Sequence, residues 1–249
     1  MPTTHETGHT KNVNTFFSLI GFVNGWGADY KPTKEAISAA NLAALQPQCE
    51  TAIKTADDQE KVFNDLVDKR MIAFNPMQSY STRVVNAFSV IDLPQDTVNG
   101  AIQINRKIQG KRATAKKNTP TAEGTQASTK GKSVSASQLS YDNNVKHFSD
   151  LTAWVSLQPA YNPNEADLKV KALNQFKDKL DKANKEVING QVPYQNKLDE
   201  RDALLYAPKT GMVDIALEVK KYALSVFGSK SPKYKQISGL KFTNRPRKK

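Results

Sequence analysis

Cysteine and histidine are scarce in this chain of 249 residues, which contains one cysteine, Cys49, and three histidines. A single cysteine excludes an internal disulfide bond and a cysteine-based metal cluster. Cys49 falls at an apolar position of a helical pattern. We therefore interpret it as a small core residue rather than a reactive thiol.

Long hydrophobic runs are also lacking, since the longest nearly apolar stretch covers only residues 15–23. That stretch is too short to cross a bilayer. The first residues are polar and have no apolar h-region, so we expect no signal peptide. The simplest expectation is a soluble cytoplasmic protein without a membrane span.

Sustained alternation of apolar and polar residues, the pattern of a half-buried strand, is absent as well. Apolar residues instead recur in steps of three and four, as in Leu42, Leu45 and Cys49, which is typical of amphipathic helices. The sequence therefore predicts an all-α fold.

The apolar spacing occurs twice, at a separation of about 131 residues. Matched pairs include Phe16 and Phe148, Tyr30 and Tyr161, Leu42 and Leu173, and Tyr222 with Ile91. This internal duplication predicts two tandem homologous helical bundles joined by a flexible basic linker. The predicted division is a flexible N-terminus at 1–12, bundle repeat 1 at 13–110, a disordered basic linker at 111–143, bundle repeat 2 at 144–240 and a basic tail at 241–249.

The middle of each repeat allows two interpretations. The apolar phase continues without an insertion, which favours one long helix. The run Asn189-Gly190-Gln191-Val192-Pro193 is a strong helix breaker. We expect two antiparallel helices with a short connection near 56–60 and 189–193, with a kinked continuous helix as the alternative.

Positive charge is concentrated outside the predicted bundles. The net charge is +12, of which residues 111–133 carry +5 and residues 229–249, which contain no acid, carry +8. Flexible lysine and arginine neutralise phosphates and release counterions. The candidate nucleic-acid-binding residues are Lys230, Lys233, Tyr234, Lys235, Lys241, Arg245, Arg247, Lys248 and Lys249 in the tail, and Lys111, Arg112, Lys116 and Lys117 in the linker; Tyr234 and Phe242 could stack on unpaired bases.

Two further patterns are interpreted as non-catalytic. His5-Glu6-Thr7-Gly8-His9 matches the zinc-protease string H-E-x-x-H, but it has no apolar helix face and no third ligand. We expect no metal and no cofactor. Asp68 with Arg70, and Asp199 with Arg201, recur at matching places and predict a structural polar layer in each bundle.

No acid/base cluster or phosphate-binding loop repeats in both halves, so we expect a protein that is not an enzyme. The predicted function is binding: a structural protein that engages nucleic acid or a ribonucleoprotein surface through its basic linker and tail. The alternative is a helical scaffold whose bundles bind other proteins or associate with copies of the chain.

Overall fold

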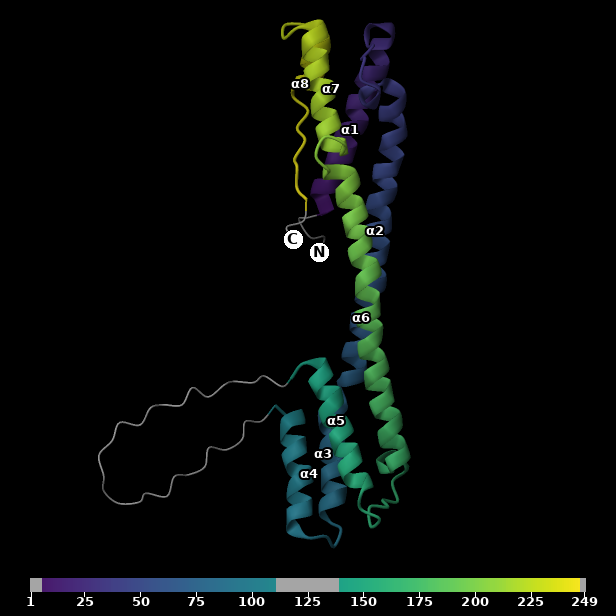
Figure 1. Cartoon of the computed structure of the whole chain (residues 1–249), viewed down its shortest axis with the longest axis vertical. Coiled ribbons are helices and arrows are strands. Elements are labelled where there is room, and N and C mark those ends of the chain that lie inside the picture. The colour runs from purple at the N-terminus through teal and green to yellow at the C-terminus, as the bar shows by residue number, and fades with distance from the viewer. Residues whose placement is uncertain (1–5, 111–138, 247–249) are drawn as a thin grey trace, which may run out of the picture. The chain divides into compact units, whose positions relative to one another are not determined.

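The computed structural model describes residues 6–110 and 139–246 (Figure 1). These residues form α-helices and three short 3-10 helices, and they contain no β-strand. The predicted all-α fold is confirmed. Within the described ranges, none of the helices is long and apolar enough to cross a membrane.

The two halves of the chain contain a similar order of elements, except that η1 of the first half has no counterpart among the described residues of the second. The first half comprises α1 (Glu6–Trp26), η1 (Gly27–Asp29), η2 (Glu35–Ile37), α2 (Ala39–Phe74), α3 (Met77–Ser89) and α4 (Gln95–Ile108). The second half comprises α5 (Tyr141–Ser156), η3 (Ala166–Leu168), α6 (Val170–Tyr206), α7 (Met212–Phe227) and α8 (Pro232–Ser238).

The central helices of both halves are continuous. α2 has 36 residues and contains Pro47, and α6 has 37 residues and contains Pro193. The expectation of a connection near 56–60 and 189–193 was wrong. An interior proline removes one hydrogen bond and costs about 3 kcal/mol, whereas the apolar stripe continues on both sides of it and is buried by packing.

The N-terminus also differs from expectation. Residues 6–12, expected to be flexible, form the first turns of α1. The reason is tertiary packing, because Asn12 and Val13 are 3% and 2% exposed and lie against the rest of the fold. α2 ends at Phe74, directly before Asn75-Pro76, and α6 ends at Tyr206, directly before Ala207-Pro208.

The chain forms two compact units, and each takes segments from both halves of the sequence. Unit 1 comprises residues 1–64 and 189–249, and unit 2 comprises residues 65–188. Unit 1 contains α1, η1, η2, the first part of α2, the last part of α6, α7 and α8. Unit 2 contains the rest of α2 and α6 together with α3, α4, α5 and η3. The compact units therefore do not coincide with the predicted bundles 13–110 and 144–240.

The core of unit 1 joins α1 to helices from the far end of the sequence. Phe16, Leu19 and Val23 of α1 are at most 1% exposed and share one cluster with residues of α7 and α8. α8 packs against α7 and α1, and η2 packs against α7 (Figure 1). The partners contributed by the second half include Met212, Ala216, Val219, Ala223 and Ile237.

The core of unit 2 is built in the same way, except that its α5 comes from the second half of the sequence and the helices packed against it come from the first half. Phe148, Leu151 and Val155 of α5 are at most 1% exposed and lie among residues of α3 and α4. α4 packs against α3 and α5, and η3 packs against α3. The partners contributed by the first half include Val84, Val85, Phe88, Ala101 and Ile108.

Replacing Gly100 by alanine is expected to destabilise unit 2. A Cβ on Gly100 would lie 2.3 Å from Cζ2 of Trp154, whose ring nitrogen donates to the carbonyl of Thr97 at 2.9 Å. Displacing the ring should cost about 1–3 kcal/mol of unfolding free energy, measured by chemical denaturation. The matched control is Gly21→Ala in α1, where no atom lies within 4 Å; it should instead stabilise by up to about 1 kcal/mol. Equal effects of the two substitutions would contradict this account.

Separate fragments 1–110 and 139–249 are expected to fold only when mixed, because each compact unit needs segments from both. Amphipathic helices without a packing partner are marginal in water. Each fragment alone should therefore show reduced helicity and no cooperative thermal transition by circular dichroism. The equimolar mixture should recover both. Tandem independent bundles predict the opposite, namely that each fragment unfolds cooperatively as a monomer.

Candidate nucleic-acid interface

The basic C-terminal segment, defined as residues 229–246, starts with a capped helix. The Ser231 side chain accepts a hydrogen bond from the amide of Lys233, and Pro232 occupies the first turn of α8. Both features favour helix initiation. After α8 the chain continues without helix or strand to residue 246 (Figure 1).

A reciprocal pair of hydrogen bonds holds this segment on α1. The buried Asn12 side chain donates to the carbonyl of Thr243 at 2.7 Å and accepts from the Thr243 amide at 3.1 Å. Lys220 of α7 donates to the carbonyls of Ser238 and Leu240 at 3.0 and 2.8 Å. Burial lowers the pKa of the Lys220 ammonium group. The segment is thus tied to unit 1 at two places.

The two aromatic residues proposed for base stacking pack inward. Tyr234 and Phe242 are partly buried and lie against the core cluster of unit 1. An aromatic ring needs an open face to stack on an unpaired base. In the docked segment these rings stabilise the attachment to unit 1 instead.

Lys233 is engaged within unit 1 as well. Its ammonium group forms an ion pair with Asp29 and lies 5.0 Å from the centre of the Phe227 ring. The hydrogen bond from Lys233 lowers the pKa of the Asp29 carboxyl group. This lysine therefore links α8 to the turn after α1.

Four of the predicted basic residues are exposed and make no ion pair with the described residues: Lys230, Lys235, Lys241 and Arg245. No acidic residue follows Glu218 in the sequence. The docked segment therefore presents positive charge without local neutralisation. The other predicted basic residues lie outside the described ranges: Lys111, Arg112, Lys116, Lys117, Arg247, Lys248 and Lys249.

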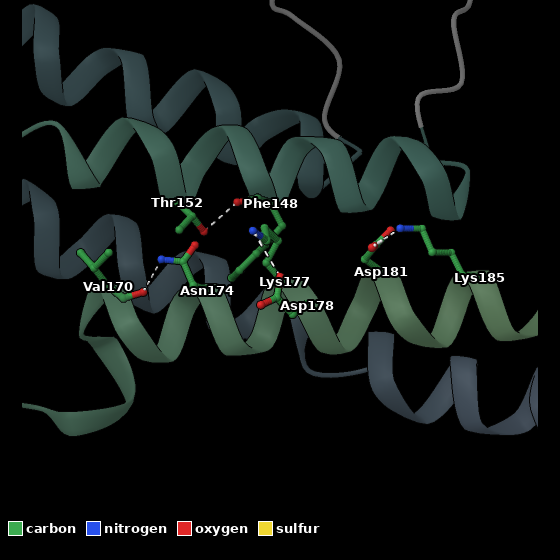
Figure 2. A network of polar contacts seen from close by, with 8 residues as sticks. All are labelled: Phe148, Thr152, Val170, Asn174, Lys177, Asp178, Asp181 and Lys185. Carbon is green, nitrogen blue, oxygen red and sulfur yellow. Dashed lines mark hydrogen bonds and ion pairs between the residues drawn. The ribbon is translucent and has the colours of Figure 1, made fainter.

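Lysines on α6 are placed differently from those of the C-terminal segment. Lys177 pairs with Asp178 at 3.3 Å, and Lys185 pairs with Asp181 at 2.6 Å. Figure 2 shows that both pairs join residues of the same helix, as do the hydrogen bonds of Asn174 and Thr152 to their own helices. Local carboxylates neutralise these lysines, so this face has little excess positive charge.

The predicted polar layer is divided between the two units. In unit 2, Arg70 donates to Asn184 at 3.3 Å and its guanidinium carbon lies 3.8 Å from the centre of the Tyr141 ring. Asn184 in turn donates to Asp142 at 2.6 Å. These contacts join α2, α5 and α6. Asp68 is exposed and does not pair with Arg70.

In unit 1, Arg201 pairs with the adjacent Asp202, which was not among the residues predicted from the sequence. It forms two hydrogen bonds with Asp202, at 3.0 and 2.8 Å, and the two side chains are 11% and 13% exposed. Asp199 is exposed at the surface of α6. The carboxylate that pairs with Arg201 is therefore Asp202, and the structural polar layer stays a prediction.

Titratable groups in the cores have perturbed pKa values. Cys49 is 0% exposed, and burial raises the pKa of its thiol to about 12, which agrees with a structural core residue. His147 is 5% exposed, and its ring nitrogens find no hydrogen-bond partner among the described residues. Burial lowers the pKa of its imidazole, so the neutral form is favoured in the fold.

Only part of the H-E-x-x-H string lies within the described residues. His5 lies outside the described residues, and His9 is hydrogen-bonded through Nδ1 to the Tyr206 hydroxyl at 2.6 Å. Within residues 6–110 and 139–246, no group of three or more histidine, cysteine, aspartate or glutamate side chains is placed to hold a metal ion. His9 therefore has a packing contact in unit 1.

Comparison with known protein families, with curated proteins and with solved structures gave no match.

Asn12→Ala is expected to release the C-terminal segment from unit 1. The substitution removes both hydrogen bonds to Thr243 and should cost about 1–3 kcal/mol of local attachment. Trypsin should then cleave after Lys241 faster than in the wild-type protein, as measured by limited proteolysis and mass spectrometry. The control is Asn14→Ala on the same helix, where the side chain is exposed. Equal cleavage rates in the two variants would contradict the attachment.

Proposed function

We propose that the protein is a non-enzymatic binding protein that engages nucleic acid through its basic linker and C-terminal segment. The observation that carries the proposal is the docked segment, in which Lys235, Lys241 and Arg245 are exposed on a stretch without acidic residues. Tethering these cations to unit 1 lowers the conformational entropy lost on binding. Phosphate neutralisation by such cations is sequence-tolerant and sensitive to salt.

Because Tyr234 and Phe242 pack inward, the proposed binding mode does not include base stacking by these two rings. Without exposed rings in the segment, binding relies on phosphate contacts rather than on base stacking. We therefore expect similar affinities for oligonucleotides of different base composition. The basic residues of the linker at 111–117 add further phosphate contacts in the proposal.

We also propose that the two halves arose by internal duplication. Support comes from the similar order of elements apart from η1, from central helices of 36 and 37 residues, and from the similar pattern of helix packing in both units. Tyr30 and Tyr161 each donate a hydrogen bond to the carbonyl seven residues later, at 2.7 and 2.8 Å.

The nucleic-acid proposal is tested with the triple variant Lys235→Gln/Lys241→Gln/Arg245→Gln. Fluorescence anisotropy with a labelled single-stranded oligonucleotide should show about tenfold weaker binding or more, because three phosphate contacts are lost. The slope of log affinity against log salt should also fall in magnitude, by roughly 2, between roughly 50 and 200 mM salt.

The matched control is Lys177→Gln/Lys182→Gln/Lys185→Gln, which changes the net charge by the same amount on α6. These lysines form ion pairs within their own helix, so this variant should bind almost like the wild type. Equal losses in both triple variants would show a general effect of net charge. That result, or no salt-dependent binding by the wild type, would overturn the proposal.

A helical scaffold is the second candidate, and exposed apolar side chains on the long helices favour it. Ile72 is 71% exposed, Val192 61% and Met71 55%. Contiguous exposed apolar side chains are typical of surfaces that contact other proteins, and Met71 and Ile72 are adjacent in the sequence of α2. This candidate requires oligomers or a bound protein partner that persist in the triple variant, measured by light scattering and pull-down after nuclease treatment; a monomer without partner would exclude it.

A further inference from the structure

His147 of α5 is a buried titratable side chain on the face that α5 turns toward α4. Gly100 of α4 lies beside Trp154 of α5, and Gly110, just after α4, lies beside Leu139, just before α5. The two helices therefore run antiparallel. His147 precedes Trp154 by seven residues, which is almost two helical turns, so both side chains lie on the same face of α5. The ring of His147 is thus placed against the last turns of α4.

The ring of His147 has no polar partner in place of water. It is 5% exposed, and neither ring nitrogen has a hydrogen-bond partner among the described residues. The neighbouring Phe148 and Leu151 of α5 belong to the apolar core of unit 2. A neutral imidazole tolerates such surroundings at the cost of unmade hydrogen bonds, whereas a charged imidazole needs an acceptor or a carboxylate.

The charges near the ring disfavour its protonation. Lys107 of α4 and Lys146 of α5 act on the imidazole as positive charges, and Asp150 of α5 is the carboxylate that favours the protonated form. Asp150 is already paired with Lys146 at 3.2 Å. Burial, followed by the charge of Lys107, keeps the pKa of the His147 imidazole below its ordinary value.

The other titratable groups on the helices of unit 2 have partners elsewhere or lie far along their helix. Asp96 is in the first turn of α4, at the opposite end from the ring. On α3, Tyr80 donates to the carbonyl of Asp167, and Arg83 pairs with the Asp167 carboxylate at 2.7 Å. Arg70 of α2 is held in the polar contacts described above, and the carboxylates of α6 drawn in Figure 2 pair with lysines of that helix. A charged ring at His147 therefore gains no ion pair from these groups.

We propose that His147 makes the packing of α4 on α5 sensitive to acid, so that proton uptake by its imidazole separates the two helices. On separation the ring regains water and moves away from Lys107, so the open form binds a proton more tightly than the packed form. The packing is therefore fully stable above the ordinary imidazole value of 6.5 and weakens as the pH falls below it. This device belongs to unit 2 and goes beyond the proposed nucleic-acid function.

The test follows amide hydrogen exchange of the full ¹⁵N-labelled chain by NMR at about pH 7.0 and about pH 5.5, corrected for the intrinsic exchange rate. Protection of the α4 and α5 amides should fall about three- to tenfold, because uptake of one proton changes the opening equilibrium by at most tenfold per pH unit. The amides of α1 and α7 in unit 1 should keep their protection. The His147 imidazole should titrate with a midpoint below 6.5 in the same samples.

Three variants assign the effect to this side chain. His147→Gln removes the titrating group and keeps a polar side chain, so protection of α4 and α5 should be almost equal at the two pH values. His147→Leu should be equally insensitive and replaces the glutamine variant where that variant is misfolded by circular dichroism. The matched control is His9→Gln, which removes a histidine that is hydrogen-bonded to Tyr206 in unit 1. It should show the same fall in unit 2 as the wild type.

The proposal fails if protection of α4 and α5 in the wild-type chain does not fall between the two pH values. An equal fall in unit 1 would also overturn it, since acid would then act on the whole chain. So would a fall that persists in folded His147→Gln or His147→Leu. Oligonucleotide binding is measured separately on the C-terminal segment variants, so the nucleic-acid proposal can fail without this one.

Discussion

The continuity of α2 and α6 is the constraint on which the rest of the structure depends. α2 begins in unit 1 and ends in unit 2, so the helices that precede and follow it in the sequence belong to different units. Repeat 1 therefore cannot close into a bundle of its own. α1 is buried against α7 and α8, and α3 and α4 are buried against α5. Each core is completed by the other half of the sequence.

The apolar cores and the unpaired positive charges lie in different parts of the structure. The cores are apolar, and the few buried polar groups are mostly satisfied, as with Asn12 on Thr243 and Asn184 between Arg70 and Asp142. Lys177, Lys182 and Lys185 pair with carboxylates of their own helix. In the C-terminal segment Lys233 pairs with Asp29, whereas Lys230, Lys235 and Lys241 make no ion pair with the described residues. The docked segment thus combines attachment through uncharged contacts with exposed cations. This division allows positive charge to accumulate without an electrostatic penalty in either core.

The two units differ in where the helix beside the loop tyrosine ends. α7 continues to Phe227 and carries Tyr222 onto the loop tyrosine, whereas α3 ends at Ser89, ahead of Asp92-Leu93-Pro94. Proline disfavours helix at the residue before it and in the preceding turn. Both loop tyrosines are 6% exposed, but Tyr30 meets the ring of Tyr222 whereas Tyr161 meets the ring of Phe88, and a pocket of about 530 Å³ lies beside Tyr161.

Local patterns in the sequence account for the helical class, for the helix ends before Pro76 and Pro208, and for the faces of the helices that are buried. These follow from local rules, because apolar spacing and proline act within a few residues. The sequence also located the basic segments, since charge is a property of composition. It did not show that Tyr234 and Phe242 pack inward, that Arg201 pairs with Asp202, or that a pocket lies beside Tyr161. Which half of the sequence completes each core is visible only in the folded chain. Similar apolar stripes would allow the helices of one half to pack either with each other or with helices of the other half. The second arrangement is found because α2 and α6 continue as helices through Pro47 and Pro193, and their packing offsets the cost of each proline.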